Sequence, residues 1–358
     1  MDRLAELRKV IKSEKLDGML ITKDQNQFYF EGFIGSECYY LITEGKSFLI
    51  ADSRYTEMAS QSCRYAEIVQ HRDPFPPYNE VIAELCSSNN IKKLGFEADS
   101  MKYLQYSSIK SDLDKCGAEM LPTENLCENI RAVKDDSEIE LIAKACEIAD
   151  KSLRELITFM KPGISEMALV RELEYIMCKN GADKPSFSTM VLFGAKASQP
   201  HAVPSHDALL KEGDLILIDY GASYRGYLSD TTRTFVCGKA DPKQEENYKR
   251  VLASQIAGVE AVKRGNTTFN VDKASRDLLR GEGCFTYGVG HGVGLEIHEQ
   301  PFMRRTTSFP LEDNMIVTVE PGIYIPGWGG IRIEDTVCVK GDSALILTKF
   351  PKDILISV

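Results

Sequence analysis

Two aspartates eleven residues apart, Asp219 and Asp230, are the first candidates for chemistry in this chain. Asp219 ends an apolar run, residues 215–218, that has the pattern of a buried strand. Residues 223–226 are a plausible four-residue hairpin loop, which would place Asp219 opposite Asp230. Opposed Cβ atoms lie about 4.5–5.5 Å apart, and like charges there are destabilising. The two carboxylates would therefore share a proton or hold a cation, unless a bulge shifts the register and turns both to water.

A glycine-rich block, residues 288–301, places His291 and His298 among four glycines. Glycine allows a backbone to approach closely or to take unusual angles. In a straight strand, residues seven positions apart face opposite sides, so the chain must bend if both imidazoles are to reach one site. The alternative is a glycine-rich turn with two surface histidines. His71 and His206 lie outside the block, and we expect them to be ordinary surface histidines.

Two acidic motifs follow the glycine-rich block. Glu320 ends an apolar strand pattern, residues 317–319, and is followed by Pro-Gly. Residues 330–335 alternate in polarity, so Arg332 and Glu334 would share one face of a strand. A charge on a buried face needs a partner, and a plain Arg332–Glu334 ion pair is one interpretation of this motif.

Together the motifs supply four carboxylates and one imidazole: Asp219, Asp230, Glu320, Glu334 and His291. Four negative charges in one pocket require cations, and two divalent ions would balance them. Oxygen ligands with one nitrogen and no sulfur suit Mn²⁺, Co²⁺ or Fe²⁺, with Zn²⁺ also compatible. Paired ions about 3.5–4 Å apart activate a water and stabilise a tetrahedral intermediate, which is hydrolytic chemistry.

The composition limits where such a site can lie. A length of 358 residues suggests two domains, and the apolar content of 43% is a globular value. The sequence contains no apolar run near the ~18 residues of a membrane helix, and its amino terminus reads as an amphipathic helix rather than a signal peptide. The net charge of −10 argues against a nucleic-acid partner. Ten cysteines without a CxxC pair favour reduced thiols in the cytoplasm.

The pattern of elements predicts how the motifs are held. Residues 1–128 alternate helix and strand patterns, which predicts an α/β domain with a mixed sheet. In residues 129–358, Ser137 and Glu140 form a potential capping box that opens an amphipathic helix. From there the expected order is two helices, strands, two helices and strands. All the candidate metal ligands fall in this second domain.

Taken as a set and in this order, the motifs resemble those of the pita-bread metallopeptidase family, and within it the Xaa-Pro peptidases aminopeptidase P and prolidase. The first half resembles the amino-terminal domain shared with creatinase, including Asp52-Ser-Arg54-Tyr55 after a strand. The resemblance implies an α+β chain, with a creatinase-like α/β domain at 1–128. It implies a catalytic domain at 129–358 with a curved antiparallel sheet flanked by helices. It also implies a homodimer.

The resemblance further implies two divalent metal ions, most readily Mn²⁺. One would be bound by Asp219 and Asp230. The other would be bound by Asp230, His291, Glu320 and Glu334. Of these, Asp230 and Glu334 would bridge the two ions.

The resemblance also implies catalytic or supporting roles for five side chains. Glu320 would also serve as the general base. His298 would hydrogen-bond the scissile carbonyl, and His201, in Gln-Pro-His, would help to bind substrate and steady the intermediate. Arg332 would orient the acidic ligands or the substrate, and Tyr324 would support the site from behind.

The expected substrates are proline-containing peptides. An Xaa-Pro bond lacks the amide N–H that many proteases read, and a metal-activated hydroxide does not need it. We therefore predict an exopeptidase that releases the residue before proline. The compact length favours aminopeptidase P, and prolidase, restricted to dipeptides, is the alternative. A non-catalytic peptide binder on the same fold is a remote alternative, because the ligand set is complete.

Overall fold

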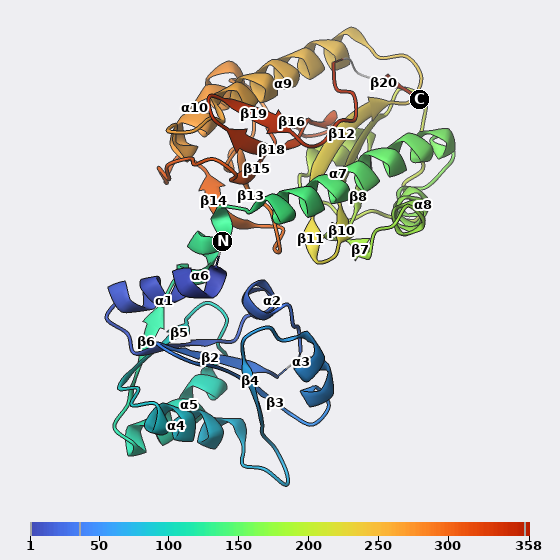
Figure 1. Ribbon diagram of the computed structural model, residues 1–358. Coiled ribbons are helices and arrows are strands. Elements are labelled where there is room, and N and C mark those ends of the chain that lie inside the picture. Colours follow the sequence, from blue (N-terminus) through green and yellow to red (C-terminus); the bar gives the residue numbers. More distant parts are fainter. Residues whose placement is uncertain (1, 36, 354–355) are drawn as a thin grey trace. The chain divides into compact units, whose positions relative to one another are not determined.

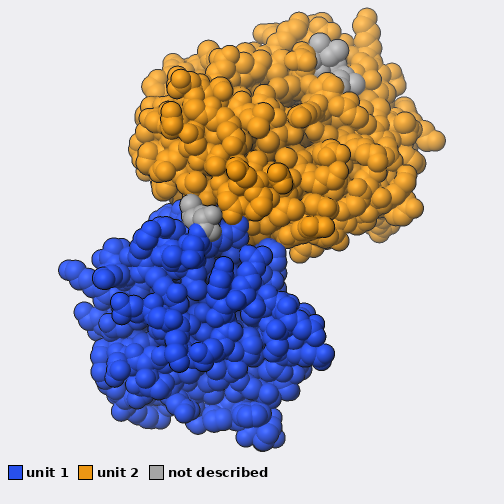
Figure 2. Space-filling model, in the orientation of Figure 1, with its two compact units in different colours: residues 1–131 blue, residues 132–358 orange. Residues whose placement is uncertain are grey.

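The computed structural model describes residues 2–35, 37–353 and 356–358 (Figure 1). The chain divides into two compact units, Met1–Arg131 and Ala132–Val358, which Figure 2 distinguishes by colour. Within the described residues, none of the helices combines the length and the apolar character that a membrane crossing requires.

Unit 1 is built on a six-stranded sheet in the order β4-β3-β2-β1-β5-β6. Its strands are β1 (Gly18–Ile21), β2 (Tyr39–Thr43), β3 (Ser47–Ala51), β4 (Glu67–Gln70), β5 (Lys93–Glu97) and β6 (Glu119–Thr123). Its helices are α1 (Arg3–Ser13), α2 (Asp24–Glu31), α3 (Thr56–Ser62), α4 (Tyr78–Ser88), α5 (Tyr103–Lys115) and α6 (Leu126–Ala132), whose last residue already belongs to unit 2. β2 pairs antiparallel with β1 and β3, and the remaining pairs are parallel. The predicted mixed sheet is therefore confirmed.

The expectation that His71 lies on the surface is wrong. Its side chain is 2% exposed and its ring packs against Tyr39 and Tyr78. Its Nε2 lies 3.4 Å from the carbonyl oxygen of Glu37. Removal from water lowers the pKa of His71, which favours the neutral ring. His206 is exposed, as expected.

Unit 2 has two pairs of helices that alternate with strands, in the predicted order. The helices are α7 (Asp136–Leu156), α8 (Glu166–Lys179), α9 (Pro242–Ala261) and α10 (Thr268–Leu278). The capping box of α7 is formed by Asp135 and Glu138, not by Ser137 and Glu140. The helix begins at Asp136, so Ser137 already lies within its first turn, where its hydroxyl donates to Asp135.

The strands of unit 2 form several sheets, with mainly antiparallel pairing. Before α9 they are β7 (Lys184–Pro185), β8 (Met190–Phe193), β9 (Leu215–Tyr220), β10 (Ala222–Tyr224), β11 (Tyr227–Leu228) and β12 (Thr231–Val236). After α10 they are β13 (Gly290–Gly292), β14 (Glu299–Met303), β15 (Ile316–Val319), β16 (Gly322–Ile325), β17 (Gly329–Arg332), β18 (Asp335–Lys340), β19 (Ser343–Ile346) and β20 (Ile356–Ser357). The two larger sheets have the orders β20-β12-β9-β8 and β14-β13-β15-β18-β19.

The alternation of β9 directs Asp219 to one side of its sheet. Leu215 and Leu217 pack into the core that also contains residues of α9 and α10. Ile216 and Ile218 pack into the opposite core, which contains residues of α7 and α8. Because side chains alternate along a strand, Asp219 follows Leu217 onto the side of α9 and α10.

The hairpin around β10 and β11 corrects the predicted register. Its loop is the two-residue turn Arg225-Gly226, and both φ angles are positive, at 51° and 85°. This is the pattern of a type I′ turn, whose twist matches the strands that it joins. As a result Asp219 pairs with Thr232, not with Asp230. The error is two residues, and a shift of two keeps every side chain on its face, so both aspartates still point to the same side.

Candidate metal centre

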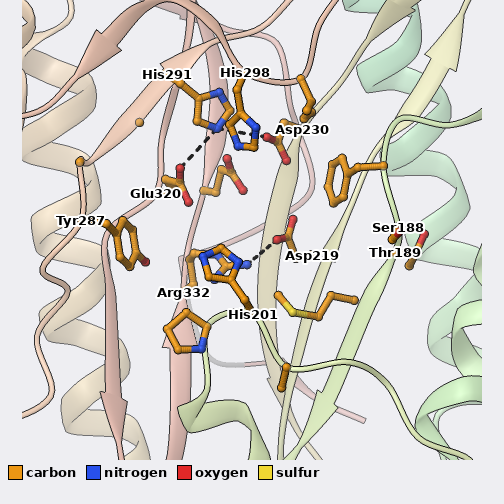
Figure 3. A pocket seen from close by; sticks show the side chains of 18 of the residues that line it. Ser188, Thr189, His201, Asp219, Asp230, Tyr287, His291, His298, Glu320 and Arg332 are labelled. Atoms are coloured by element: carbon orange, nitrogen blue, oxygen red, sulfur yellow. Dashed lines mark hydrogen bonds and ion pairs between the residues drawn. The ribbon is translucent and has the colours of Figure 1, made fainter. Parts of the chain in front are cut away.

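A cavity of about 590 Å³ in unit 2 brings the predicted site residues together (Figure 3). It is lined by all five predicted metal ligands and by the three further predicted site residues: Asp219, Asp230, His291, Glu320, Glu334, His201, His298 and Arg332. They come from β9, β13, the ends of β15 and β17, the start of β12 and the intervening loops. Residues more than a hundred positions apart in sequence thus line the same cavity.

Three of the expected ligands form the tightest group. One donor atom each from Asp230, His291 and Glu334 lie within 4.8 Å of one another. Nε2 of His291 is 3.6 Å from a carboxylate oxygen of Asp230 and 3.4 Å from one of Glu320. Nδ1 of His291 lies 3.1 Å from the carbonyl oxygen of Gly292, which places the ring proton on Nδ1. Nε2 is then left as an electron-pair donor toward the carboxylates.

Within this cluster, two buried carboxylate oxygens have no hydrogen-bond donor among the described residues: Oδ1 of Asp219 and Oε1 of Glu334. The second oxygen of each is occupied. Oδ2 of Asp219 accepts from Arg332 at 2.5 Å, and Oε2 of Glu334 accepts from the hydroxyl of Thr232 at 2.7 Å. A buried acceptor without a donor costs about 1–3 kcal/mol. Divalent cations would satisfy these oxygens, so these residues fit a metal.

The electrostatics of the carboxylates lead to the same conclusion. Burial raises the pKa of Asp219, and it raises the pKa of Asp230 and of Glu334 well above their ordinary values. The charge of Glu320 adds to the shift in all three cases. Without metal, the cluster therefore holds protons. Cations in the same place would allow the acids to ionise.

Arg332 does not pair with Glu334, so that interpretation of the alternating motif is wrong. Ile331 and Ile333 enter the core, and Arg332 and Glu334 take the opposite face, as predicted. The guanidinium, however, forms its ion pair with Asp219. It also donates to the hydroxyls of Thr232 and Tyr324, each at 2.9 Å. These contacts fix the orientation of the Asp219 carboxylate.

The chain bends between β13 and β14, so that both histidines face the cavity. The ring centroids of His291 and His298 are 4.3 Å apart, and His291 is buried, which excludes a turn with two surface histidines. A Cβ atom on Gly290 would lie 2.0 Å from the carbonyl oxygen of Thr318. Glycine is therefore required for the close backbone approach. Partial burial and then the neighbouring His291 lower the pKa of His298, which keeps that ring neutral.

Sequence reasoning missed two contributors to this site. Thr232 donates to Glu334 and accepts from Arg332. The alternation of side chains along a strand could have identified Thr232, because it lies two residues after Asp230 and therefore on the same face. Tyr287 lines the cavity four residues before His291. Nothing in its sequence context distinguishes it from a core tyrosine.

Two stretches of the chain match known protein families. Residues 140–341 match metallopeptidase family M24, and residues 3–133 match the creatinase/prolidase N-terminal domain. The chain is 40% identical to the uncharacterized peptidase YqhT of Bacillus subtilis and 36% identical to an Xaa-Pro dipeptidase of Pyrococcus furiosus, with 99% of each chain covered in both cases.

Solved structures of peptidases are similar to nearly the whole chain. An Xaa-Pro dipeptidase from Bacillus anthracis has a TM-score of 0.95 at 39% identity, over 100% of this chain and 99% of that one. An X-Pro aminopeptidase from Thermotoga maritima has a TM-score of 0.87 at 32% identity, over 97% and 100%. With the family matches, these structures confirm the predicted fold class, a creatinase-type domain followed by a metallopeptidase domain.

Proposed function

Because the chain belongs to metallopeptidase family M24, we propose that it hydrolyses the bond between an amino-terminal residue and a following proline. The observation that carries this proposal is the buried cluster of Asp230, His291 and Glu334, in the cavity that also holds the open oxygen of Asp219. Such a donor set suits paired divalent ions. Relatives named Xaa-Pro dipeptidase and putative Xaa-Pro aminopeptidase support the choice of bond.

We assign the ligands as follows. Asp219 and Asp230 hold one divalent ion, and the other is held by Asp230, His291, Glu320 and Glu334. Mn²⁺ is the proposed metal, with Co²⁺, Fe²⁺ and Zn²⁺ as the alternatives. When bound, the ions supply a water acidic enough to attack an amide at neutral pH.

The side chains around the ligands perform the remaining steps. Glu320 accepts a proton from the attacking water and delivers it to the proline nitrogen as the amide bond breaks. His298 and His201 donate to the scissile carbonyl oxygen as negative charge develops there. Arg332 holds Asp219 in place through their ion pair. The residue before proline needs a free amine, because one of the two ions would offer that nitrogen a binding site.

The division of the chain gives the two parts separate tasks. Residues 129–358 form the catalytic domain in this proposal, and residues 1–128 form a domain that supplies none of the ligands assigned above. The protein is expected to act on peptides as a homodimer.

The preferred peptide length distinguishes two candidate activities. The compact chain favours an aminopeptidase that accepts longer peptides. The Pyrococcus furiosus and Bacillus anthracis relatives carry the name Xaa-Pro dipeptidase, which favours prolidase as the second candidate. The two activities share one chemistry and differ in whether the cavity admits residues beyond proline.

One experiment tests both candidates. Chelator-treated protein is offered Ala-Pro, Ala-Pro-Ala-Ala and Ala-Ala with Mn²⁺, Co²⁺, Zn²⁺ or Mg²⁺, and the released alanine is measured. We expect Mn²⁺ or Co²⁺ to restore cleavage of the proline peptides better than Mg²⁺, with Ala-Ala cleaved poorly. Cleavage of Ala-Pro alone would identify a dipeptidase. Full activity without metal, or no cleavage of either proline peptide, would refute the proposal.

A further inference from the structure

A chain of hydrogen bonds leads from the metal centre to a tyrosine in the cavity wall. Arg332, paired with Asp219, donates from Nη1 to the hydroxyl of Tyr324 at 2.9 Å. The hydroxyls of Tyr324 and Tyr287 are 2.6 Å apart. Tyr324 is 8% exposed and lies behind the wall, whereas Tyr287 lines the cavity. In Figure 3 the hydroxyl of Tyr287 points into the cavity.

The direction of these bonds follows from the donors available. A guanidinium can only donate, so the oxygen of Tyr324 accepts from Arg332. The proton of Tyr324 then needs an acceptor, and within the described residues the oxygen of Tyr287 is the one in reach. The reverse direction would leave a buried hydroxyl proton without a partner. Tyr324 therefore donates to Tyr287, and the proton of Tyr287 is directed into the cavity.

Tyr287 is also held firmly from behind. Arg276 of α10 donates to the backbone carbonyl of Tyr287 at 2.6 Å and to that of Phe285 at 2.8 Å. The same guanidinium is anchored by the carboxylate of Asp272. Burial raises the pKa of Tyr287 well above its ordinary value, so the hydroxyl remains protonated. The cavity thus presents a neutral donor in a fixed position.

We propose that Tyr287 binds substrate by donating a hydrogen bond to the carbonyl or carboxylate oxygen of the proline that follows the scissile bond. This inference rests on the proposed function. A proline residue within a peptide has no N–H, so its carbonyl group is the one polar backbone group it offers. His298 and His201 are assigned to the scissile carbonyl. Arg332 is already engaged by Asp219, Thr232 and Tyr324.

Arg304 is the competing cationic donor in the cavity wall. It also lines the cavity, but its side chain is exposed and its guanidinium lies over the ring of Phe302, 5.0 Å from the centroid. Tyr287, in contrast, is fixed by Arg276 and Tyr324. A fixed donor loses less freedom when it binds a ligand, which favours Tyr287.

The test is the kinetics of Tyr287→Phe with Ala-Pro and with Ala-Pro-amide. Binding to proline's oxygen is equal in ground and transition state, so KM should rise while kcat stays within about twofold. A charged acceptor makes the stronger bond, so we expect KM to rise about tenfold for Ala-Pro and about threefold for the amide. Equal rises for both peptides, or a fall in kcat at constant KM, would overturn the assignment.

Three further variants separate binding from structure. Tyr248→Phe removes a buried hydroxyl that donates to the carbonyl oxygen of Lys352 at 2.9 Å, and it should leave KM unchanged. Tyr324→Phe removes the positioning group and should raise KM less than Tyr287→Phe does. The KM of the double variant should be no higher than that of Tyr287→Phe alone, because both changes break the same chain of hydrogen bonds. Additive effects would contradict that chain.

The outcomes distinguish this inference from the function on which it rests. If wild-type protein cleaves neither peptide, the proposed function is wrong, whatever the variants do. If wild-type protein cleaves both and Tyr287→Phe matches it, only the role of Tyr287 is wrong. A KM that rises in Arg304→Gln but not in Tyr287→Phe would assign proline's oxygen to Arg304 instead.

Discussion

At the scale of single residues, the centre depends on acids that are too close together to ionise without cations. Glu320 differs from the other ligands because it is assigned the proton transfer as well as a metal.

In Glu320→Ala we expect kcat to fall at least about 100-fold, since a positioned general base contributes about 10²–10⁴-fold. The melting temperature should remain close to that of the wild type. Glu260→Ala, at an exposed site on α9, is the matched control and should retain full turnover. Wild-type turnover by Glu320→Ala would remove its assigned role.

The raised pKa values of Asp230 and Glu334 predict how metal binding depends on pH. Their ordinary values are 3.8 and 4.5, and burial raises both in the metal-free fold. The stability that the protonated acids contribute is complete below those ordinary values and is lost as pH rises through the raised ones. Mn²⁺ replaces these protons, so its effect on the melting temperature should grow as the pH rises above those ordinary values.

Thermal unfolding with chelator and with Mn²⁺ across this range measures the effect. Asp230→Asn removes one titrating acid and should flatten the dependence. A stabilisation by Mn²⁺ that is independent of pH in wild-type protein would show that these acids do not exchange protons for metal.

Residue types identified the acids but not all of their partners. The resemblance of the motifs to a known family implied that Asp219, Asp230 and Glu334 meet, and all three line one cavity. The partner of Arg332 was not predictable, because the choice between Glu334 and Asp219 depends on which strands adjoin. Tyr287 could not be assigned for a similar reason, since its contact with Tyr324 joins two segments that are not neighbours in sequence.

At the scale of elements, glycines allow the strands around the centre to approach. A Cβ on Gly290 would clash with the backbone of Thr318, next to the strand end that carries Glu320. We expect Gly290→Ala to lower the free energy of unfolding by about 1–3 kcal/mol, as overpacking does, and to weaken Mn²⁺ binding.

Urea unfolding and metal titration of Gly290→Ala test this expectation. Gly45→Ala is the control, because no atom lies within 4 Å of its Cβ position and its φ is ordinary. If Gly290→Ala binds Mn²⁺ as tightly as Gly45→Ala, the close approach is not needed for the site.

Elements were easier to predict than their pairing. The apolar patterns located β9, β15 and the helices of unit 2, because burial imposes a clear period. The hairpin register was wrong by two residues, since the turn type depends on the φ of Arg225, which its residue type does not reveal. The predicted face of Asp219 was still right, because a register shift of two residues keeps each side chain on the same side of its strand.

At the scale of the whole molecule, unit 2 contains every proposed ligand and two apolar cores of its own. We therefore expect a fragment comprising residues 132–358 to fold and to bind two Mn²⁺ ions per chain, as the full chain should. Isothermal titration calorimetry gives the stoichiometry, and circular dichroism verifies the fold. The same fragment with Asp230→Ala is the control and should lose the stoichiometric binding. A folded fragment that binds no Mn²⁺ would mean that residues 1–131 are needed to complete the centre.

The placement of the ligands along unit 2 also bears on how the protein is made. Asp219 and Asp230 leave the ribosome before Glu320 and Glu334 do. Between the synthesis of Asp230 and that of Glu320, the nascent chain therefore carries two of the four acids without the other two. A product that stops before Glu320 lacks two of the four acids and therefore cannot form the complete two-ion site.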